Sequence, residues 1–392
     1  MQEKNVLPAC LEKIICGITD EQKKCNASKT VVVGMSGGVD SSVSAYLMKL
    51  QGYNVIGLFM HNWEETEGGF CTAEQDYTDV KRVCEKIGIP YYSVNFAKEY
   101  YDRVFTEFLQ EYKAGRTPNP DVLCNREIKF GPFLEYALAM GADFIATGHY
   151  AKVENQNGVF YLKKCKDASK DQTYFLNQLN QYQLSKVFFP LADLLKTEVR
   201  EIARYAGLIN AEKKDSTGIC FIGERNFKNF LQGYLPAKEG IIMSLDGKIL
   251  GKHSGVMFYT LGQRKGLNIG GYAGGNGKPW YVVDKDVEKN ILYVNQGEEG
   301  DVLCSISCIA EKFHFIFQYD KKQFGAQAKF RYRQEDQQVD VSILEDGKLQ
   351  IDFKEPQRAV TPGQYAVLYI GDICLGGAKI EFAQNVFKKE NK

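Results

Sequence analysis

Apolar residues between positions 30 and about 150 follow two alternating periodicities. Short, nearly continuous apolar runs predict strands, and segments with an apolar residue every three or four positions predict helices. A near-continuous apolar run is typical of a strand that is buried on both faces of a parallel sheet. The predicted strands are 31–33, 55–60, 91–96 and 142–147. Their alternation with helical segments predicts an α/β fold with a doubly wound parallel sheet.

The predicted helices fall between these strands. The first follows the glycine-rich segment after Val33, and the others carry apolar residues at helical spacing. They span about 41–51, 77–87, 101–112 and 133–138, and a short helix is expected near 10–18. Ligands of doubly wound sheets bind beyond the carboxyl ends of the strands. The glycine segment, Met60 and Gly148 all lie at such ends, so they are expected to converge on one site.

The pattern changes after residue 224. Glycines cluster at 262–277 and helical periodicity is weak except near 226–233, which predicts a small central domain over 225–290. From 291 onward, short alternating runs separated by turn residues predict a C-terminal β-barrel over 291–392. The α/β domain then covers 30–224. Residues 1–29 form an N-terminal extension, which we expect to be a loosely docked tail.

Composition narrows the setting in which the protein works. Lysine plus arginine and aspartate plus glutamate both number 49, so the formal net charge is zero and a nucleic-acid partner would need a local basic face. No apolar run approaches the ~20 residues of a membrane span, and no secretory signal is visible. The eleven cysteines then indicate free thiols in a reducing compartment, the cytoplasm.

The segment after the first predicted strand has the composition of a phosphate-binding loop. Its glycines let backbone N–H groups approach phosphate oxygens, and the following helix adds partial positive charge at its N-terminus. The residues are Gly34, Met35, Ser36, Gly37, Gly38, Val39, Asp40 and Ser41. Unlike a Walker A loop, the segment has no lysine. Asp40 would repel a bare phosphate and is therefore expected to face magnesium.

A loop without the lysine clamp is less suited to transfer of the terminal phosphate of ATP. It suits cleavage at the α-phosphate, which releases pyrophosphate and leaves an adenylate. The alternative is a glycine-rich turn that binds no ligand.

Two cysteines lie in unusual settings. Asp121 and Cys124 are three residues apart after a proline-rich loop, so a helix beginning there places them on one side. The helix N-terminus would favour the Cys124 thiolate, and the Asp121 carboxylate would oppose it. The alternative is an N-cap aspartate followed by a buried cysteine. Cys220 follows a glycine turn, and a second thiol suggests sulfur relay by thiol–disulfide exchange.

These motifs resemble two nested families. The SGGVDS pattern is similar to that of the N-type ATP pyrophosphatases, or PP-loop enzymes. The wider chain resembles the tRNA-specific 2-thiouridylases, and the resemblance covers nearly everything after Lys29 except the segment 66–70. The runs that carry it are GMSGGVDSSVSA, GLFMHNWEE, CTAEQD, EYKAGRTPNPDVLCNREIKF, IATGHY, KDQTYFL, KDSTGICFIGERNF, YTLGQRKGL, PWYVVDKD and TPGQ.

The resemblance implies a function and a role for each motif. The family replaces the 2-carbonyl oxygen of the tRNA wobble uridine with sulfur, using ATP and magnesium. ATP would lie against residues 34–41, with the adenine near Met60 and Gly148. Cys124 would be the nucleophile and Cys220 the persulfide carrier, with Asp121 handling protons. The target base would be surrounded by Asn119, Pro120 and Asp121. The remaining tRNA contacts would be His149, Lys170, Asp171, Gln172, Arg331, Tyr332 and Gln364.

The resemblance also implies a cysteine desulfurase or a sulfur-carrier protein as sulfur donor. We expect the enzyme to be a monomer. From the residues alone, His149 would be a satisfied core or loop residue. The segment 331–333 would likewise be a solvated barrel strand.

Three alternatives remain open at this point. A PP-loop ligase could deliver nitrogen to a small carbonyl substrate, in which case the cysteines would be dispensable. A non-catalytic RNA-binding protein could retain the loop without turning over ATP. Finally, Asp121, Cys124 and Cys220 could ligate an iron–sulfur cluster instead of relaying a persulfide.

Overall fold

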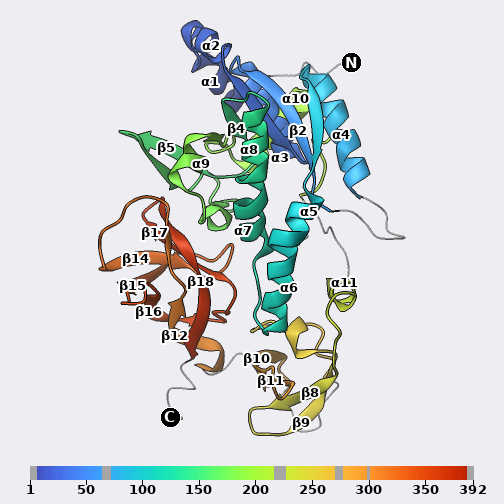
Figure 1. The fold of residues 1–392 in the computed structure, drawn as a ribbon, viewed down its shortest axis with the longest axis vertical. Coiled ribbons are helices and arrows are strands. Elements are labelled where there is room, and N and C mark those ends of the chain that lie inside the picture. Colours follow the sequence, from blue (N-terminus) through green and yellow to red (C-terminus); the bar gives the residue numbers. More distant parts are fainter. Residues whose placement is uncertain (1–6, 64–71, 216–226, 270–276, 298–300, 386–392) are drawn as a thin grey trace. The chain divides into compact units, whose positions relative to one another are not determined.

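The structure is a computed structural model that describes residues 7–63, 72–215, 227–269, 277–297 and 301–385 (Figure 1). The chain divides into two compact units. Unit 1 comprises Met1–Val104, Asp121–Glu224 and Asp372–Leu375. Unit 2 comprises Phe105–Pro120, Arg225–Gly371 and Gly376–Lys392.

Unit 1 is built on a five-stranded sheet in the order β3-β2-β1-β4-β7, and every neighbouring pair is parallel. This confirms the predicted doubly wound α/β fold. The central strand is fully buried at Val31, Val32 and Val33, as its apolar run indicated. The strands are β1 Thr30–Met35, β2 Asn54–His61, β3 Tyr91–Asn95, β4 Phe144–Ala146 and β7 Val187–Phe188.

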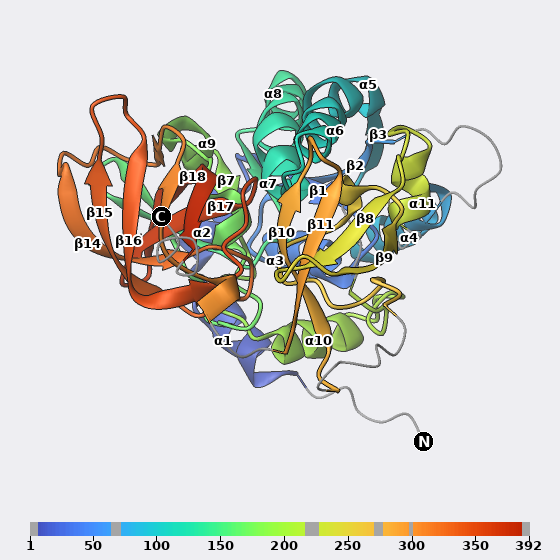
Figure 2. The same ribbon diagram turned by 90° about the horizontal axis from the view of Figure 1, so that it is seen from below.

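Helices cover both faces of this sheet. Right-handed crossovers place α3 and α4 on one face and α8 on the other, because the strand order reverses between β1 and β4. Figure 2 shows α8 and α10 on opposite sides of the sheet. The helices and short helical turns of this unit are α3 Val39–Leu50, α4 Thr72–Ile87, α5 Ala97–Tyr100, η1 Tyr101–Phe105, α7 Pro120–Cys124, η2 Asn125–Lys129, α8 Pro132–Ala139, η3 Thr173–Leu176, α9 Gln181–Ser185 and α10 Lys196–Tyr205. Within the described ranges, the structure contains no helix that is long and apolar enough to cross a membrane.

The N-terminal extension is docked, so the prediction of a loose tail is wrong for its described part, which starts at residue 7. It forms α1 Ala9–Cys16 and α2 Asp20–Asn26. Leu11 is completely buried in the same apolar core as β1. The side-chain amide of Asn26 donates to the Gln51 carbonyl at 2.8 Å. The extension is therefore an integral part of the α/β core.

Unit 1 also carries a hairpin that the sequence pattern did not reveal. It consists of β5 Lys152–Gln156 and β6 Val159–Lys163, joined at Asn157 and Gly158. Both turn residues have positive φ, 53° and 86°, as a two-residue hairpin turn requires. The Asn-Gly pair was the available signal. The first strand, β5, was not predicted because the mixed polarity of Lys152–Gln156 does not follow a strand pattern.

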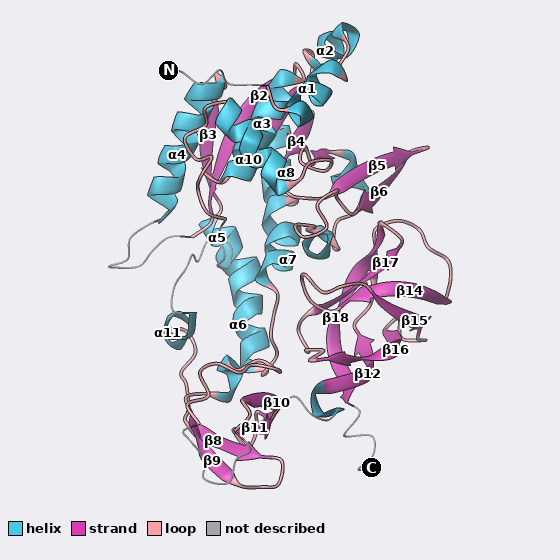
Figure 3. Cartoon of the chain, turned by 180° about the vertical axis from the view of Figure 1, so that it is seen from behind, coloured by secondary structure: helices cyan, strands magenta, loops and turns pink. Residues whose placement is uncertain are grey.

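Unit 2 contains a four-stranded sheet and a closed barrel (Figure 3). The barrel closes because β12 pairs with both β16 and β18, which confirms the predicted C-terminal β-barrel. The smaller sheet has the order β10-β11-β8-β9, so β11 pairs with the central strands although the predicted boundary at residue 290 precedes it.

The elements of this unit are α6 Thr106–Lys113, α11 Phe227–Gln232, β8 Gly240–Ser244, β9 Ile249–His253, η4 Val256–Phe258, β10 Trp280–Asp286, β11 Ile291–Gln296, η5 Asp301–Leu303, β12 Cys304–Ala310, β13 His314–Phe315, β14 Gln323–Lys329, β15 Gln337–Ile343, β16 Leu349–Arg358, β17 Tyr365–Ile370 and β18 Ile373–Asn385.

The segment Phe105–Pro120 belongs to unit 2, although it lies between two parts of unit 1 in the sequence. Glu111 of α6, whose side chain is 6% exposed, is held there by charge. It accepts hydrogen bonds from two guanidinium nitrogens of Arg116, both at 2.6 Å, and one from Lys379 of β18 at 3.3 Å. Burial raises the pKa of Glu111, but these cations outweigh it and the pKa is lowered overall. The ion pairs thus tie the segment to the barrel.

We expect Leu11→Ala to destabilise the whole protein. The substitution removes a completely buried side chain, which costs about 2–5 kcal/mol where the surroundings relax only in part. Lys13→Ala, at an exposed position in the same helix, is the control and should change stability by less than about 0.5 kcal/mol. Chemical denaturation measures both. Equal stabilities of the two variants would mean that the extension does not share the core.

Candidate active site

The glycine loop connects the buried strand β1 to helix α3. Its two serines organise the backbone: Ser36 N–H donates to Ser41 Oγ at 3.2 Å, and Ser41 Oγ donates to the Gly38 carbonyl at 3.1 Å. Gly38 is the N-cap of α3 in an extended conformation. The first-turn N–H groups of a helix have no intrahelical partner, so this end can accept an anion.

Two glycines are required by close approach. Gly37 has φ +74°, and a Cβ there would lie 2.7 Å from the Asp76 carbonyl oxygen. Gly148, which follows β4, would place a Cβ 2.7 Å from the backbone nitrogen of Ser41. The structure therefore brings Gly148 to the loop, as the sequence predicted for strand ends at one edge. Met60 lies at the same edge, one residue beyond the Phe59 that pairs with Met35 at the end of β1.

Asp40, in the first turn of α3, is neutralised by a lysine from far along the chain. Lys196 Nζ lies 2.7 Å from each carboxylate oxygen. The Tyr150 hydroxyl donates to the same carboxylate at 2.8 Å, and this carboxylate together with burial raises the pKa of Tyr150. The loop has no lysine of its own, but the fold supplies one from the first residue of α10.

Asp215 extends this charge cluster. Its carboxylate forms ion pairs with Lys196 at 2.8 Å, Lys170 at 2.8 Å and Arg200 at 3.1 Å. Burial raises the pKa of Asp215, but the hydrogen bonds from the two lysines outweigh it and lower the pKa to about 2. Lys170, predicted to contact tRNA, therefore shares its carboxylate partner with Lys196. The latter lies at the glycine loop of residues 34–41, which is predicted to bind ATP and is called the ATP loop.

The turn of the loop is fixed from the same part of the chain. The side-chain amide of Asn210 donates to the Gly37 carbonyl at 3.0 Å and to Ser42 Oγ at 2.8 Å. Lys213 Nζ also donates to the Gly37 carbonyl, at 3.2 Å. That lysine is held by Asp76 and Asp79 of α4, both at 2.7 Å.

Five residues of this site were not predicted from the sequence: Tyr150, Lys196, Asn210, Lys213 and Asp215. One local signal existed: Lys196 begins a helix, where the helix dipole disfavours a cation. A lysine at that position needs an anionic neighbour. The identity of that neighbour, 156 residues away, depends on tertiary structure alone.

Cys124 is the last residue of the five-residue helix α7 and is completely buried. Burial raises the pKa of its thiol to about 12, Lys129 lowers it and Asp121 raises it further. The expectation that the helix N-terminus favours the thiolate is therefore wrong for this conformation. One carboxylate oxygen of Asp121 is buried without a hydrogen-bond partner. A protonated thiol and an unsatisfied carboxyl oxygen thus lie three residues apart.

Cys220 and the segment 66–70 lie outside the described residues. The nine described cysteines are all free thiols. Among the described side chains, no group of three or more His, Cys, Asp or Glu residues could hold a metal ion. The set of Asp121, Cys124 and Cys220 is not covered by this statement, because Cys220 lies outside the described residues.

Asn119 was predicted to lie beside the target base and Gln364 to contact tRNA. The two residues contact each other within unit 2. The Asn119 side-chain amide donates to the Gln364 side-chain oxygen at 3.3 Å. Gln364 in turn donates to the carbonyls of Thr117 and Pro118, at 2.8 and 3.2 Å. The turn after Pro362 therefore supports the loop that precedes Pro120 and Asp121.

Three other predicted tRNA contacts have structural partners in unit 1. His149 is buried, bonds Thr147 Oγ1 through Nδ1 at 2.8 Å, and has a pKa held well below its usual value by burial. Asp171 is buried and accepts from the backbone N–H groups of Cys165 and Thr173. Gln172 accepts from the Tyr150 N–H at 2.9 Å. In this structure all three side chains hydrogen-bond to protein groups.

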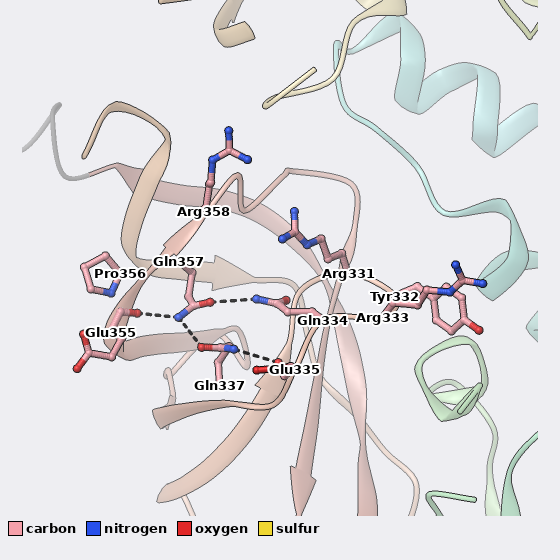
Figure 4. A pocket seen from close by; sticks show the side chains of 10 residues that line it. All are labelled: Arg331, Tyr332, Arg333, Gln334, Glu335, Gln337, Glu355, Pro356, Gln357 and Arg358. Atoms are coloured by element: carbon pink, nitrogen blue, oxygen red, sulfur yellow. Dashed lines mark hydrogen bonds between the residues drawn. The ribbon is translucent and has the colours of Figure 1, made fainter. Parts of the chain in front are cut away.

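Arg331 and Tyr332 lie in the turn after β14, so their predicted placement on a barrel strand is wrong. Arg333, the next residue, has φ +64°, which a strand does not allow. The guanidinium group of Arg333 stacks on the Tyr332 ring at 5.3 Å. These residues line an open pocket together with Gln334, Glu335, Gln337, Glu355, Pro356, Gln357 and Arg358 (Figure 4).

Hydrogen-bonded glutamines form the floor of this pocket. Gln357 is buried, accepts from Gln334 at 3.0 Å and donates to Gln337 at 2.9 Å. Figure 4 shows the guanidinium groups of Arg331 and Arg358 extending away from this chain of glutamines. The exposed arginines give a chain of zero net charge a local group of cations beside the tyrosine ring.

The parallel sheet, with an SGGVDS loop where its strand order reverses, defines a PP-loop ATP pyrophosphatase. Comparison with known families matches three profiles. They are described as a tRNA methyl transferase HUP domain at residues 29–224, a tRNA methyl transferase PRC-barrel domain at 228–296 and an aminomethyltransferase beta-barrel domain at 305–380.

Curated relatives identify the family more narrowly. The tRNA-specific 2-thiouridylase MnmA of Alkaliphilus oremlandii is 62% identical over 90% of this chain and 96% of its own length. The enzyme of the same name from Streptococcus pyogenes is 59% identical over 91% and 96%. The chain belongs to the tRNA-specific 2-thiouridylase family.

Solved structures give only a distant similarity. The U34-tRNA thiolase NcsA from Methanococcus maripaludis with its [4Fe-4S] cluster is 21% identical, with a TM-score of 0.36, over 57% of this chain and 72% of that one. A 4-thiouridine synthetase–RNA complex with bound ATP is 20% identical, with a TM-score of 0.33, over 53% and 51%.

We expect Gly37→Ala to impair ATP binding and Gly88→Ala to leave it intact. Both glycines have φ +74°, so both substitutions cost about 1–2 kcal/mol of backbone strain. A methyl group at Gly37 also meets the Asp76 backbone, whereas nothing lies within 4 Å of the corresponding position at Gly88. Titration with a non-hydrolysable ATP analogue compares the two. Equal affinities would show that the close approach at Gly37 does not shape the loop.

Cys124 should resist alkylation in the free enzyme. With a pKa of about 12, only ~10⁻⁴ of the thiol is thiolate at about pH 8, and the reactivity should rise with pH. The exposed Cys16 and Cys25 serve as internal controls. Peptide mass spectrometry after brief iodoacetamide treatment gives the three rates. A Cys124 rate matching the exposed thiols would mean that the buried, protonated state is not the resting state.

Proposed function

We propose that this protein thiolates the 2-position of the tRNA wobble uridine in an ATP-dependent reaction. The observation that carries the proposal is that one α/β unit holds an SGGVDS loop, the buried Cys124 and, three residues before it, Asp121 with one buried carboxylate oxygen. The loop supplies activation of an oxygen, and the thiol supplies sulfur chemistry. Family membership supports uridine in tRNA as the substrate.

ATP would activate the base by adenylation. The uridine 2-oxygen attacks the α-phosphorus, pyrophosphate leaves, and the oxygen becomes part of an AMP leaving group. Backbone N–H groups of residues 34–41 would bind the phosphates, with the adenine near Met60 and Gly148. Asp40 provides the oxygen ligands that Mg²⁺ prefers and would hold the ion once its lysine partner is displaced. When bound, the ion offsets phosphate charge.

Sulfur would arrive as a persulfide on Cys220, loaded by a cysteine desulfurase or a sulfur carrier. The terminal sulfur attacks C2 of the uridine, directly or as sulfide freed by Cys124, and AMP departs with the oxygen. Thiol–disulfide exchange between the two cysteines releases the product, and an external thiol restores them. Asp121 would take the Cys124 proton; one of its carboxylate oxygens is buried and has no hydrogen-bond partner.

Each unit carries residues that we propose to contact tRNA. Asn119, Pro120 and Asp121 would face the target base, flipped out of its stack into a pocket. Arg331 and Tyr332 would contact phosphate and a base face. His149, Lys170, Asp171, Gln172 and Gln364 are further proposed contacts. The free thiols and the tRNA substrate favour a cytoplasmic enzyme, which we propose to be a monomer.

A reconstituted reaction tests the proposal. Purified protein is incubated with ATP, magnesium, a persulfide source and unmodified tRNA, and 2-thiouridine is measured by mass spectrometry. We expect pyrophosphate and AMP as co-products. Cys220→Ser should lose persulfide loading, whereas Cys124→Ser should load the persulfide and fail to thiolate tRNA.

Other outcomes separate the alternatives. Orthophosphate as the first product would contradict the PP-loop chemistry. Equal persulfide loading of the wild type and Cys220→Ser would reverse or remove the assignment of the carrier. Full activity of both cysteine variants with ammonia as donor would indicate a nitrogen ligase.

A further inference from the structure

The ATP loop contains one acidic residue, Asp40, and no basic residue, but in the folded protein Asp40 forms an ion pair with Lys196. Lys196 Nζ is 2.7 Å from both oxygens of Asp40, and the lysine side chain is only 11% exposed. No residue between Gly34 and Ser41 could compensate for Asp40 when ATP arrives with several negative charges. Lys196 is therefore the cation that the fold brings to the acidic residue of the loop.

The remaining contacts of Lys196 leave it able to exchange partners. Its second carboxylate, Asp215, also pairs with Lys170 at 2.8 Å and Arg200 at 3.1 Å. Asp215 therefore keeps two cations if Lys196 turns away. Lys213, by contrast, is held by two aspartates and supports the backbone through the Gly37 carbonyl. Of the two lysines at the loop, Lys196 is the one whose departure leaves no carboxylate beside it unpaired except Asp40.

Its position in α10 points the same way. Lys196 is the first residue of the helix, after the N-cap Leu195, where the helix dipole disfavours a cation by a few tenths to about 1 kcal/mol. The next acid, Glu198, satisfies the Leu195 N–H and pairs with Lys166 instead. Capping the helix thus does not require a lysine at this position. An anion bound at this end of the helix, in contrast, would favour a lysine here.

We propose that Lys196 binds the phosphates of ATP in place of the lysine that the loop lacks. The inference rests on the proposed function and adds a substrate-binding residue to it. In the free enzyme Asp40 and Lys196 neutralise each other. When ATP binds, Lys196 donates to phosphate and Asp40 becomes available to magnesium, so each exchanges one opposite charge for another. Tyr150, hydrogen-bonded to Asp40 at 2.8 Å, keeps the carboxylate at the site during the exchange.

The test compares Lys196→Gln, Lys196→Arg and the control Lys166→Gln with the wild type. Lys166 pairs with Glu198 of the same helix but is absent from the contacts of the loop. Titration with a non-hydrolysable ATP analogue should show ~10-fold to ~100-fold weaker binding for Lys196→Gln, the loss of one charge-assisted hydrogen bond. Lys196→Arg should retain most of the affinity, and Lys166→Gln all of it. Adenosine, measured by competition, should bind all four proteins alike because it has no phosphate.

A double variant separates phosphate binding from a purely structural ion pair. If the pair only stabilises the fold, Asp40→Asn should relieve Lys196→Gln, and the double variant should regain melting temperature and analogue affinity together. We expect melting temperature to recover in part and analogue affinity to stay low. Unchanged analogue binding by Lys196→Gln beside normal wild-type binding would overturn this inference alone. A wild type that does not bind the analogue would overturn the proposed function as well.

Discussion

The neutralisation of Asp40 is the constraint on which the site depends. An acid in the first turn of α3 sits where a phosphate must bind, so a cation has to accompany it. Lys196 fulfils this from α10, and Asp215 holds that lysine together with Lys170 and Arg200. Two carboxylates and three cations are thereby gathered at one edge of the parallel sheet. Their arrangement explains why the segment from Lys196 to Asp215 belongs to the catalytic unit as firmly as the loop itself.

Close packing complements this charge cluster. Gly37 and Gly148 allow backbone to touch backbone at the point where the strand order reverses, and Asn210 and Lys213 fix the loop through a single carbonyl. Gln172 and Tyr150 connect the same loop to the segment proposed to contact tRNA. The ATP site and part of the proposed tRNA surface therefore share side chains within unit 1. A change in one is expected to be felt in the other through Tyr150 and Asp215.

The region of Asp121 and Cys124 differs from this charge cluster because it contains a carboxyl oxygen that lacks a hydrogen-bond partner. Cys124 is buried, burial raises the pKa of its thiol to about 12, and Asp121, three residues earlier, has a carboxyl oxygen that lacks a partner. Such a pair is costly to keep in a resting structure, and burial also protects a nucleophile from reagents in solution. The proposed reaction requires the thiol to lose its proton, and we propose Asp121 as the group that accepts it. In unit 2, Gln364 supports the loop leading to Asp121 through Asn119, Thr117 and Pro118.

The sequence alone determined the class of fold and the position of the glycine loop between β1 and α3, and it predicted the roles of both cysteine motifs. These features are local: apolar periodicity, glycines at a strand–helix junction and short contiguous motifs. Only the tertiary structure decided the partners. Lys196 meets Asp40 across 156 residues, Gln364 meets Asn119 across 245, and Leu11 enters the core from a segment that resembled a tail. The pKa of Cys124 also depended on burial, which reversed the expectation from its helix. Charge pairs and burial form between distant segments, and no local pattern encodes which segments meet.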